Sequence, residues 1–114
     1  MENVNIDALS GHELDRVIAR ELGIRSPLFP CCSTDIAAAW ELDGEGWEWR
    51  LTEIPFEDEN IIAIGAWVKL PNAPHWIASV VNLNNFSTKS TAQATARCRV
   101  WLKAKYAEKN NANM

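Results

Sequence analysis

Three stretches of the chain place apolar residues at the spacing of an amphipathic helix. The apolar face of the first stretch consists of Leu14, Val17, Ile18 and Leu22. Ser10 and Glu13 precede this face with the spacing of a capping box, in which each side chain accepts from the amide of the other residue. Gly23 supplies a left-handed stop. The pattern predicts a helix over about 11–22.

The stretch from Phe29 to Leu42, FPCCSTDIAAAWEL, predicts a second helix from Thr34 to about Leu42. Its expected buried side consists of Ile36, Ala39 and Trp40. Ser33 and Thr34 mark its start. Free amides at a helix start also attract anions, but Asp35 in the first turn would repel one. We therefore interpret the two hydroxyls as helix caps rather than as a phosphate site.

A third helix is predicted from about Thr91 to Ala107, after a polar approach. Its core face consists of Ala94, Cys98, Trp101 and Leu102. The approach, Ser87 to Thr91, combines four hydroxyls with Lys89 and contains no acid. Two interpretations stay open for it: an anion site at the start of the helix, or a set of helix caps.

Between the second and third helices, the pattern changes to that of strands. Residues 47–53 alternate apolar and polar side chains, which predicts a strand with one wet face. Residues 61–70 are apolar on both faces, so this strand needs cover above and below. A turn at Pro71–Pro74 leads to a third strand over 75–83, and the acidic segment 55–60 is predicted to be a loop.

The order helix, helix, strand, strand, strand, helix predicts an α+β fold in a single domain, residues 1–114. Consecutive strands joined by short turns form an antiparallel meander. A three-stranded antiparallel sheet between helices, in a three-layer α/β/α sandwich of order ααβββα, is the architecture that we expect.

Charge is divided unevenly along the chain, whose net charge is −4. Residues 1–60 hold fourteen acidic and four basic residues, net −10, whereas residues 61–114 hold seven basic residues and one acidic residue, net +6. An acidic chain binds duplex nucleic acid poorly because phosphate neutralisation dominates that affinity. The basic half still suits a small anionic ligand.

Three cysteines, Cys31, Cys32 and Cys98, give an odd count, which favours a reducing compartment. The longest apolar run, Ile61–Val68, is too short to span a membrane, and no signal pattern is visible at the start. We expect a cytoplasmic protein that does not bind a membrane.

Three segments carry a resemblance to a known family. LSGHELDRVIA at 9–19, STDIAAAWE at 33–41, and Cys98-Arg99 ahead of Leu102 resemble the phage ABA sandwich domain family in order and spacing. The resemblance implies a phage or prophage origin and a helix, sheet, helix layering, and it brings no activity with it. Residues 53–90 depart from the family's pattern, so it assigns no ligand contacts there.

A second similarity is architectural. In size and layered build the chain is similar to phage Thoeris anti-defence proteins, which act as sponges for cyclic ADP-ribose isomers. No shared motif carries this similarity.

Two arginines of the third helix suit a phosphate, since the guanidinium fork binds two oxygens at once. Arg97 and Arg99 point roughly 200° apart on a helix, so one protomer cannot aim both at one phosphate. A dimer that lends one arginine from each subunit can. The alternative interpretation is a solvated basic face.

Catalytic and metal-binding patterns are absent from the sequence. His12 and His75 lack ligand spacing and neither neighbours a nucleophile elbow, so we expect no enzyme activity, no metal and no cofactor. Trp40, Trp47, Trp49 and Trp101 occupy expected core positions, whereas Trp67 and Trp76 suit either the core or a groove.

The functional hypothesis is a non-enzymatic phage or prophage binding protein that sequesters a nucleotide-derived host immune signal, a cyclic nucleotide or a cyclic ADP-ribose isomer. Its predicted ligand-binding residues are Asn82, Asn84, Phe86, Lys89, Arg97 and Arg99. The basic residues bind phosphates, the asparagines bind base or ribose edges, and the phenylalanine stacks.

This hypothesis expects a homo-oligomer in the host cytoplasm, with the site between protomers. Two alternatives remain open: an interaction protein that inhibits or docks on a host or phage protein, and a minor virion or assembly protein.

Overall fold

The computed structural model describes residues 5–24, 31–56 and 61–112. Its elements are η1 (Ile6–Ala8), α1 (Gly11–Glu21), α2 (Ile36–Trp40), β1 (Glu48–Phe56), β2 (Ile61–Lys69), β3 (Ile77–Asn82), η3 (Leu83–Asn85) and α3 (Lys89–Ala112). Each predicted helix and strand is present, within a few residues of the expected bounds. The last helix is longer than expected. Of the predicted acidic loop, residues 55 and 56 belong to β1 instead, and 57–60 lie outside the described residues.

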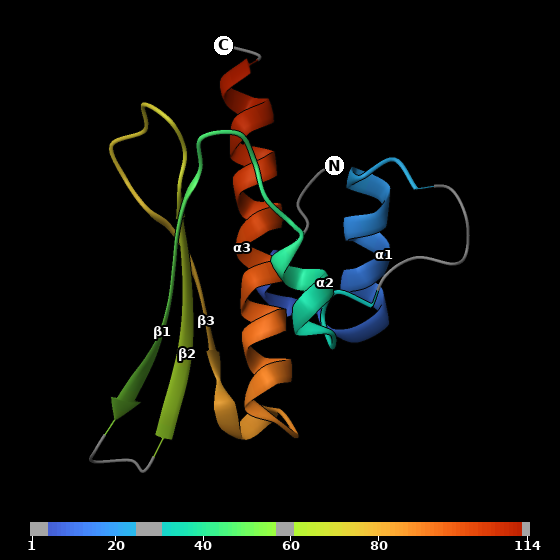
Figure 1. Ribbon diagram of the computed structural model, residues 1–114, viewed down its shortest axis with the longest axis vertical. Helices are drawn as coiled ribbons and strands as arrows, with labels where there is room; N and C mark the ends of the chain where they lie inside the picture. The colour runs from blue at the N-terminus through green and yellow to red at the C-terminus, as the bar shows by residue number, and fades with distance from the viewer. Residues whose placement is uncertain (1–4, 25–30, 57–60, 113–114) are drawn as a thin grey trace.

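The predicted fold class is confirmed: an α+β fold in which the three strands form one antiparallel sheet in the order β1-β2-β3. Figure 1 shows how the layers stack. α3 packs against β2 and β3, and α1 and α2 pack against α3. The long helix α3 therefore lies between the sheet and the two short helices. The sequence pattern predicts the sheet, not a helix, in this middle layer.

α3 occupies this position because it is buried around its circumference. Its buried residues are Ala92, Ala94, Thr95, Ala96, Arg97, Cys98, Val100, Trp101, Leu102 and Ala104. Four alanines and a cysteine let the sheet on one side and the short helices on the other approach the helix closely. The alternative interpretation of the arginines of this helix, a solvated basic face, is contradicted at Arg97, which is buried.

The sheet directs one row of side chains from each strand towards α3. Leu51 of β1 lies opposite Ala66 of β2, which lies opposite Ser79 of β3. Ile64 and Val68, on the same face of β2 as Ala66, are fully buried in the core. Asn72, with a φ of 65°, makes the left-handed position of the turn between β2 and β3, a conformation that asparagine tolerates better than most residues.

The starts of the two short helices differ from the sequence prediction. Ser10 is the N-cap residue of α1, but its side chain makes no cap hydrogen bond, so the capping box is not formed. Asp35 caps α2 in place of Ser33 and Thr34, and its carboxylate accepts from the amide of Ala37 at 3.0 Å.

Ser33 is instead buried at a junction of three helices. Its amide donates to Asp15 of α1 at 2.7 Å, its hydroxyl donates to the carbonyl of Gly11, and its own carbonyl accepts from Thr95 of α3 at 3.0 Å. These contacts connect α1, the start of α2 and α3, which explains why a serine stands at a fully buried position.

The tryptophans divide between core and surface. Trp47 and Trp101 are buried and Trp49 is half-buried, but the expected burial of Trp40 is contradicted because half of its surface is exposed. Among the described residues, no helix is both long enough and apolar enough to cross a membrane.

Candidate ligand pocket

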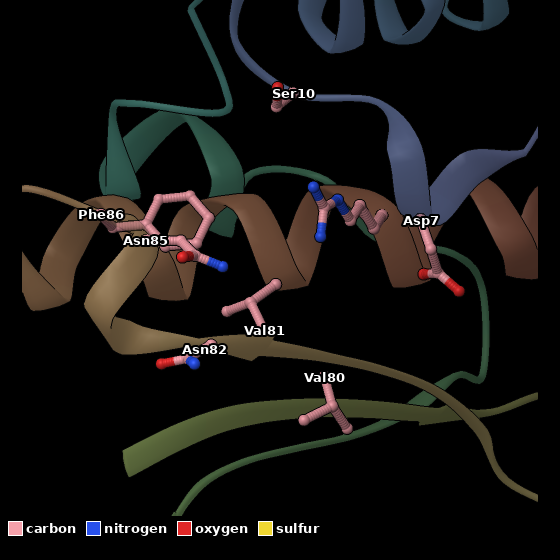
Figure 2. Close-up of a pocket in the computed structure, with 8 residues that line it drawn as sticks. Asp7, Ser10, Val80, Val81, Asn82, Asn85 and Phe86 are labelled. Carbon is pink, nitrogen blue, oxygen red and sulfur yellow. The ribbon is translucent and has the colours of Figure 1, made fainter. Parts of the chain in front are cut away.

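A pocket of about 370 Å³ lies where the end of β3, η3, α3 and the segment before α1 meet. Its lining residues are Asp7, Ser10, Val80, Val81, Asn82, Asn85, Phe86 and Arg99. In Figure 2, Asp7 lies at one end of this ring of residues, and Asn85 and Phe86 lie at the other. The pocket therefore has a charged end and an end formed by an amide and an aromatic ring.

Arg99 is the basic residue among those lining the pocket. Its Nε donates to the carbonyl of Leu9 at 2.9 Å, which fixes the guanidinium against the segment that leads into α1. Burial lowers the pKa of Arg99 and the nearby charge of Asp7 opposes this shift, so the group remains a cation. Within the described part of the chain, its two Nη groups donate no hydrogen bond.

Asp7 is the acidic residue of the pocket, and a lysine outside the pocket stabilises its charged form. Lys103 lies 2.8 Å from the Asp7 carboxylate and also donates to the carbonyl of Ala78, and the hydroxyl of Ser79 donates to the same carboxylate at 3.1 Å. Burial alone would raise the pKa of Asp7, but the hydrogen bond and charge of Lys103 outweigh it and hold the pKa below its usual range. Asp7 is therefore ionised at neutral pH.

Asn82 and Phe86 flank the short helix η3, which follows β3 directly. The side-chain carbonyl of Asn82 accepts from the amide of Asn84 at 2.9 Å and so caps η3. This hydrogen bond leaves the side-chain amino group of Asn82 as its donor. The amide of Phe86 donates to the carbonyl of Leu83, and this turn places Phe86 and Asn85 beside the end of β3.

The structure brings together three of the six predicted ligand-binding residues: Asn82, Phe86 and Arg99 line the pocket. Asn84 is exposed outside it. Lys89 forms an ion pair with Glu53 of β1, and Thr88 Oγ1 accepts from the amide of Thr91 at 3.0 Å. The stretch Ser87–Thr91 therefore behaves as a helix cap rather than as an anion site.

Arg97 requires a correction, because its fork is already occupied within its own chain. It is buried, with Nε donating to the carbonyl of Ala39 and Nη2 to that of Leu42, both at 2.9 Å. Its guanidinium also lies 4.3 Å from the ring centroid of Trp40 and 3.6 Å from that of Trp49. Arg97 thus holds the carboxyl end of α2, where carbonyl groups favour a cation.

Asp7, Ser10 and Asn85 belong to the pocket, although the sequence pattern does not single them out as ligand-binding residues. Asp7 lies in a stretch without periodicity, and Ser10 has the signature of a cap. For Asn85, a signal is present: it belongs to the same polar turn as Asn82 and Asn84, directly after a strand. Polar side chains at the end of an edge strand are a common setting for ligand contacts.

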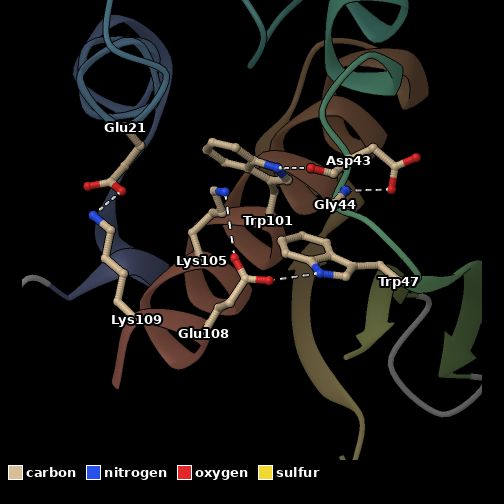
Figure 3. A network of polar contacts seen from close by, with 8 residues as sticks. All are labelled: Glu21, Asp43, Gly44, Trp47, Trp101, Lys105, Glu108 and Lys109. Atoms are coloured by element: carbon tan, nitrogen blue, oxygen red, sulfur yellow. Dashed lines mark hydrogen bonds and ion pairs between the residues drawn. The ribbon is translucent and has the colours of Figure 1, made fainter. Parts of the chain in front are cut away.

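A second polar network lies at the other end of α3, and its groups are paired with one another (Figure 3). Trp101 Nε1 donates to the carbonyl of Asp43 at 3.0 Å, and Trp47 Nε1 donates to Glu108 at 3.3 Å. Lys109 forms an ion pair with Glu21 of α1. These contacts fasten α1 and the segment before β1 to α3.

The described residues contain no group of three or more histidine, cysteine or acidic residues that is placed to hold a metal ion. No family model, curated protein or solved structure matches this chain.

Proposed function

We propose that this chain is a non-enzymatic binding protein that holds a small anionic molecule in the pocket around Arg99. The supporting observation is the half-buried guanidinium of Arg99, which lines the pocket, is fixed through Nε, and donates no Nη hydrogen bond to another described residue. Among the described residues, no carboxylate forms an ion pair with Arg99, and a partly desolvated arginine fork is a strong site for a phosphate or carboxylate.

The other lining residues suit a nucleotide-derived ligand. The side-chain amides of Asn82 and Asn85 can donate to and accept from a base or ribose, and the ring of Phe86 offers a face for stacking. A volume of about 370 Å³ lies at the lower end of the usual range for small-molecule sites, about 300–1,000 Å³. The size favours one nucleoside unit.

The ionised state of Asp7 supports binding rather than catalysis. A general acid or base works best when its pKa lies near the operating pH. The pKa of Asp7 is lowered through Lys103 and Ser79, so its carboxylate is a weak base at neutral pH. We propose that Asp7 shapes the electrostatic field of the pocket instead.

The biological role that we propose follows from the resemblance to phage ABA sandwich domains. A phage or prophage protein that binds a nucleotide-derived signal without converting it lowers the free concentration of that signal in the host cytoplasm. Cyclic nucleotides and cyclic ADP-ribose isomers are the candidate signals. Homo-oligomerisation remains a prediction, and Arg97 gives no reason to place the site between protomers, since it is bound within its own chain.

A thermal-shift panel of cyclic nucleotides, ADP-ribose derivatives and nucleoside monophosphates tests the proposal. A ligand that binds only the folded state stabilises it by about 2.7 kcal/mol at a hundred times its Kd. We expect at least one nucleotide to raise the melting temperature, and Arg99→Gln to weaken its binding at least tenfold. Arg20→Gln, an exposed arginine of α1 outside the pocket, is the matched control.

Two outcomes would contradict the proposal. In the first, no member of the panel changes the melting temperature of the unmodified chain. In the second, Arg20→Gln weakens the binding as much as Arg99→Gln does, which would locate the anion elsewhere.

A protein partner is the second candidate, and the exposed apolar side chains of β3 favour it. Val80 is 49% exposed, and Trp76, just before β3, is 39% exposed. Alternation along the strand puts both on the same face. A silent nucleotide panel, together with a co-purifying protein that is lost in Trp76→Ser, would favour this candidate.

A further inference from the structure

We propose that the pocket selects a singly charged phosphodiester of mononucleotide size over ligands that carry two or more negative charges. This inference rests on the proposed function and names its ligand class. It follows from the two opposite charges of the pocket, from the one edge of Arg99 that remains open, and from the volume.

The charges that line the pocket limit the charge of its ligand. Of the described residues that line the pocket, Arg99 is positive and Asp7 is negative. Lys103 is engaged by the Asp7 carboxylate and by the carbonyl of Ala78. Arg99 can therefore neutralise one ligand charge, whereas a second ligand charge would face Asp7 across a partly desolvated space, where repulsion is stronger than in water.

The geometry of Arg99 suits a phosphodiester. Because Nε is bound to Leu9, the free edge of the guanidinium is the pair of Nη groups. This edge matches two oxygens. A phosphodiester has two non-bridging oxygens and one charge, so the edge satisfies both. A terminal phosphate has three such oxygens and about −1.5 to −2 charges at neutral pH, so one charged oxygen is left over.

The size of the pocket suits a ligand with a single nucleotide unit. About 370 Å³ suits one nucleoside with its phosphate, with the phosphate at Arg99 and the base towards Phe86. Figure 2 shows the acidic residue Asp7 and the aromatic residue Phe86 on opposite sides of the pocket, so a base stacked on Phe86 lies away from the Asp7 carboxylate. Cyclic mononucleotides combine one diester with one base.

The sharpest test uses the protein unchanged and varies only the ligand's charge. Adenosine 5′-(methyl phosphate) differs from 5′-AMP by one methyl group and carries one charge less at pH 7.5. Calorimetric titration measures the Kd of this pair, of 3′,5′-cyclic AMP and of adenosine. The corresponding guanosine compounds are measured in the same way. We expect both diesters to bind at least tenfold more tightly than the monophosphate, and the nucleoside to bind most weakly.

A variant then tests whether Asp7 causes the selection. Asp7→Asn keeps the shape of the side chain and removes its charge. We expect the Kd for 5′-AMP to fall at least fivefold in this variant, with a smaller change for the diesters. Glu48→Gln, an exposed acid of β1 outside the pocket, is the matched control and should leave the preference unchanged.

These measurements distinguish a failure of the charge selection from a failure of the proposed function. If 5′-AMP binds as tightly as its methyl ester, the selection is wrong while the proposed function stands. If no nucleotide of either base binds, the proposed function fails as well. If Asp7→Asn does not fold, the comparison of ester and monophosphate on the unmodified chain still decides the matter.

Discussion

Buried polar side chains of this molecule join elements that are distant in the sequence. Of the described residues, Asp15, Ser33, Ser79, Thr95 and Arg97 are polar and buried. Asp15 connects α1 to the amide of Ser33, and Thr95 connects α3 to the carbonyl of the same residue. Each such pair avoids the free energy cost of an unsatisfied buried group and fixes one relative position of two elements.

The three thiols differ sharply in their surroundings. Cys31 is exposed, whereas Cys32 and Cys98 are buried. A hydrogen bond with Cys32 and burial together raise the pKa of the Cys98 thiol. Because the thiolate is the reactive form and needs access to the reagent, Cys31 should be the reactive position.

Alkylation should therefore modify one of the three cysteines of the folded chain. With iodoacetamide at pH 8, mass spectrometry should find a single rapid adduct at Cys31, and three adducts in concentrated urea. Cys31→Ser should abolish the rapid adduct. Equal labelling of Cys98 in the folded chain would show that the centre of α3 is open to solvent.

Among the elements, α2 depends most on its neighbours. A helix of five residues is far too short to be stable alone. The carboxylate of Asp35 holds its first amides, and the guanidinium of Arg97 binds the carbonyls at its other end. α2 therefore exists because α3 supplies a buried cation.

Replacing Arg97 should strongly destabilise the fold. Arg97→Met keeps much of the side-chain volume but removes the donors to Ala39 and Leu42, and we expect a loss of about 3–5 kcal/mol in the free energy of unfolding. Arg20→Met, on the exposed face of α1, should change it by about 0.5 kcal/mol or less. Urea denaturation followed by tryptophan fluorescence measures both, and equal effects would remove the structural role of Arg97.

The elements themselves could be predicted from the sequence, because periodicity and turn residues are local signals. Gly23, predicted as the stop of α1, has a φ of 79° in the structure. The middle position of α3 could not be predicted, because a helix buried all round carries small residues on faces that an amphipathic pattern leaves to solvent. Ala92 and Ala96 fit either environment.

The candidate site was predictable in part for a similar reason. Arginine chemistry is visible in the sequence, but which arginine is already bound depends on tertiary contacts. Arg97 and Arg99 are two residues apart, and one meets the carbonyls of α2 while the other meets the pocket. Asp7 lies 92 residues before Arg99 in the chain and enters the pocket only through folding.

At the scale of the whole molecule, the basic carboxyl-terminal half of the chain forms ion pairs with the acidic amino-terminal half. Lys89, Lys103 and Lys109 of α3 pair with Glu53, Asp7 and Glu21 of the acidic half. Partly exposed pairs of this kind contribute at most about 1 kcal/mol each. Within the described residues, these pairs neutralise much of the basic helix and leave Arg99 as the cation that faces the pocket.

The pair between Asp7 and Lys103 predicts a dependence of stability on pH. The pKa of Asp7 is lowered in the folded state from 3.8, so its contribution is present above pH 3.8 and is lost as the pH falls through the folded value. Asp7→Asn should therefore be less stable than the unmodified chain at pH 7, by up to about 1 kcal/mol. The difference should shrink as the pH falls below 3.8 and through the folded value of the Asp7 pKa.

Urea denaturation of both chains at several pH values between 7 and 2 measures this difference. A difference that keeps its size at the lowest pH would mean that Asp7 acts through its shape and not through its charge.

The central position of α3 also governs the order of events during translation. The elements that pack against α3 precede it in the chain, so Leu14, Ile18, Ile64 and Val68 leave the ribosome before the helix that covers them. At about 5–20 residues per second, the 24 residues of α3 occupy roughly 1–5 s of synthesis. Until then the nascent chain exposes apolar surface to chaperones, and the core can form only after α3 has been synthesised.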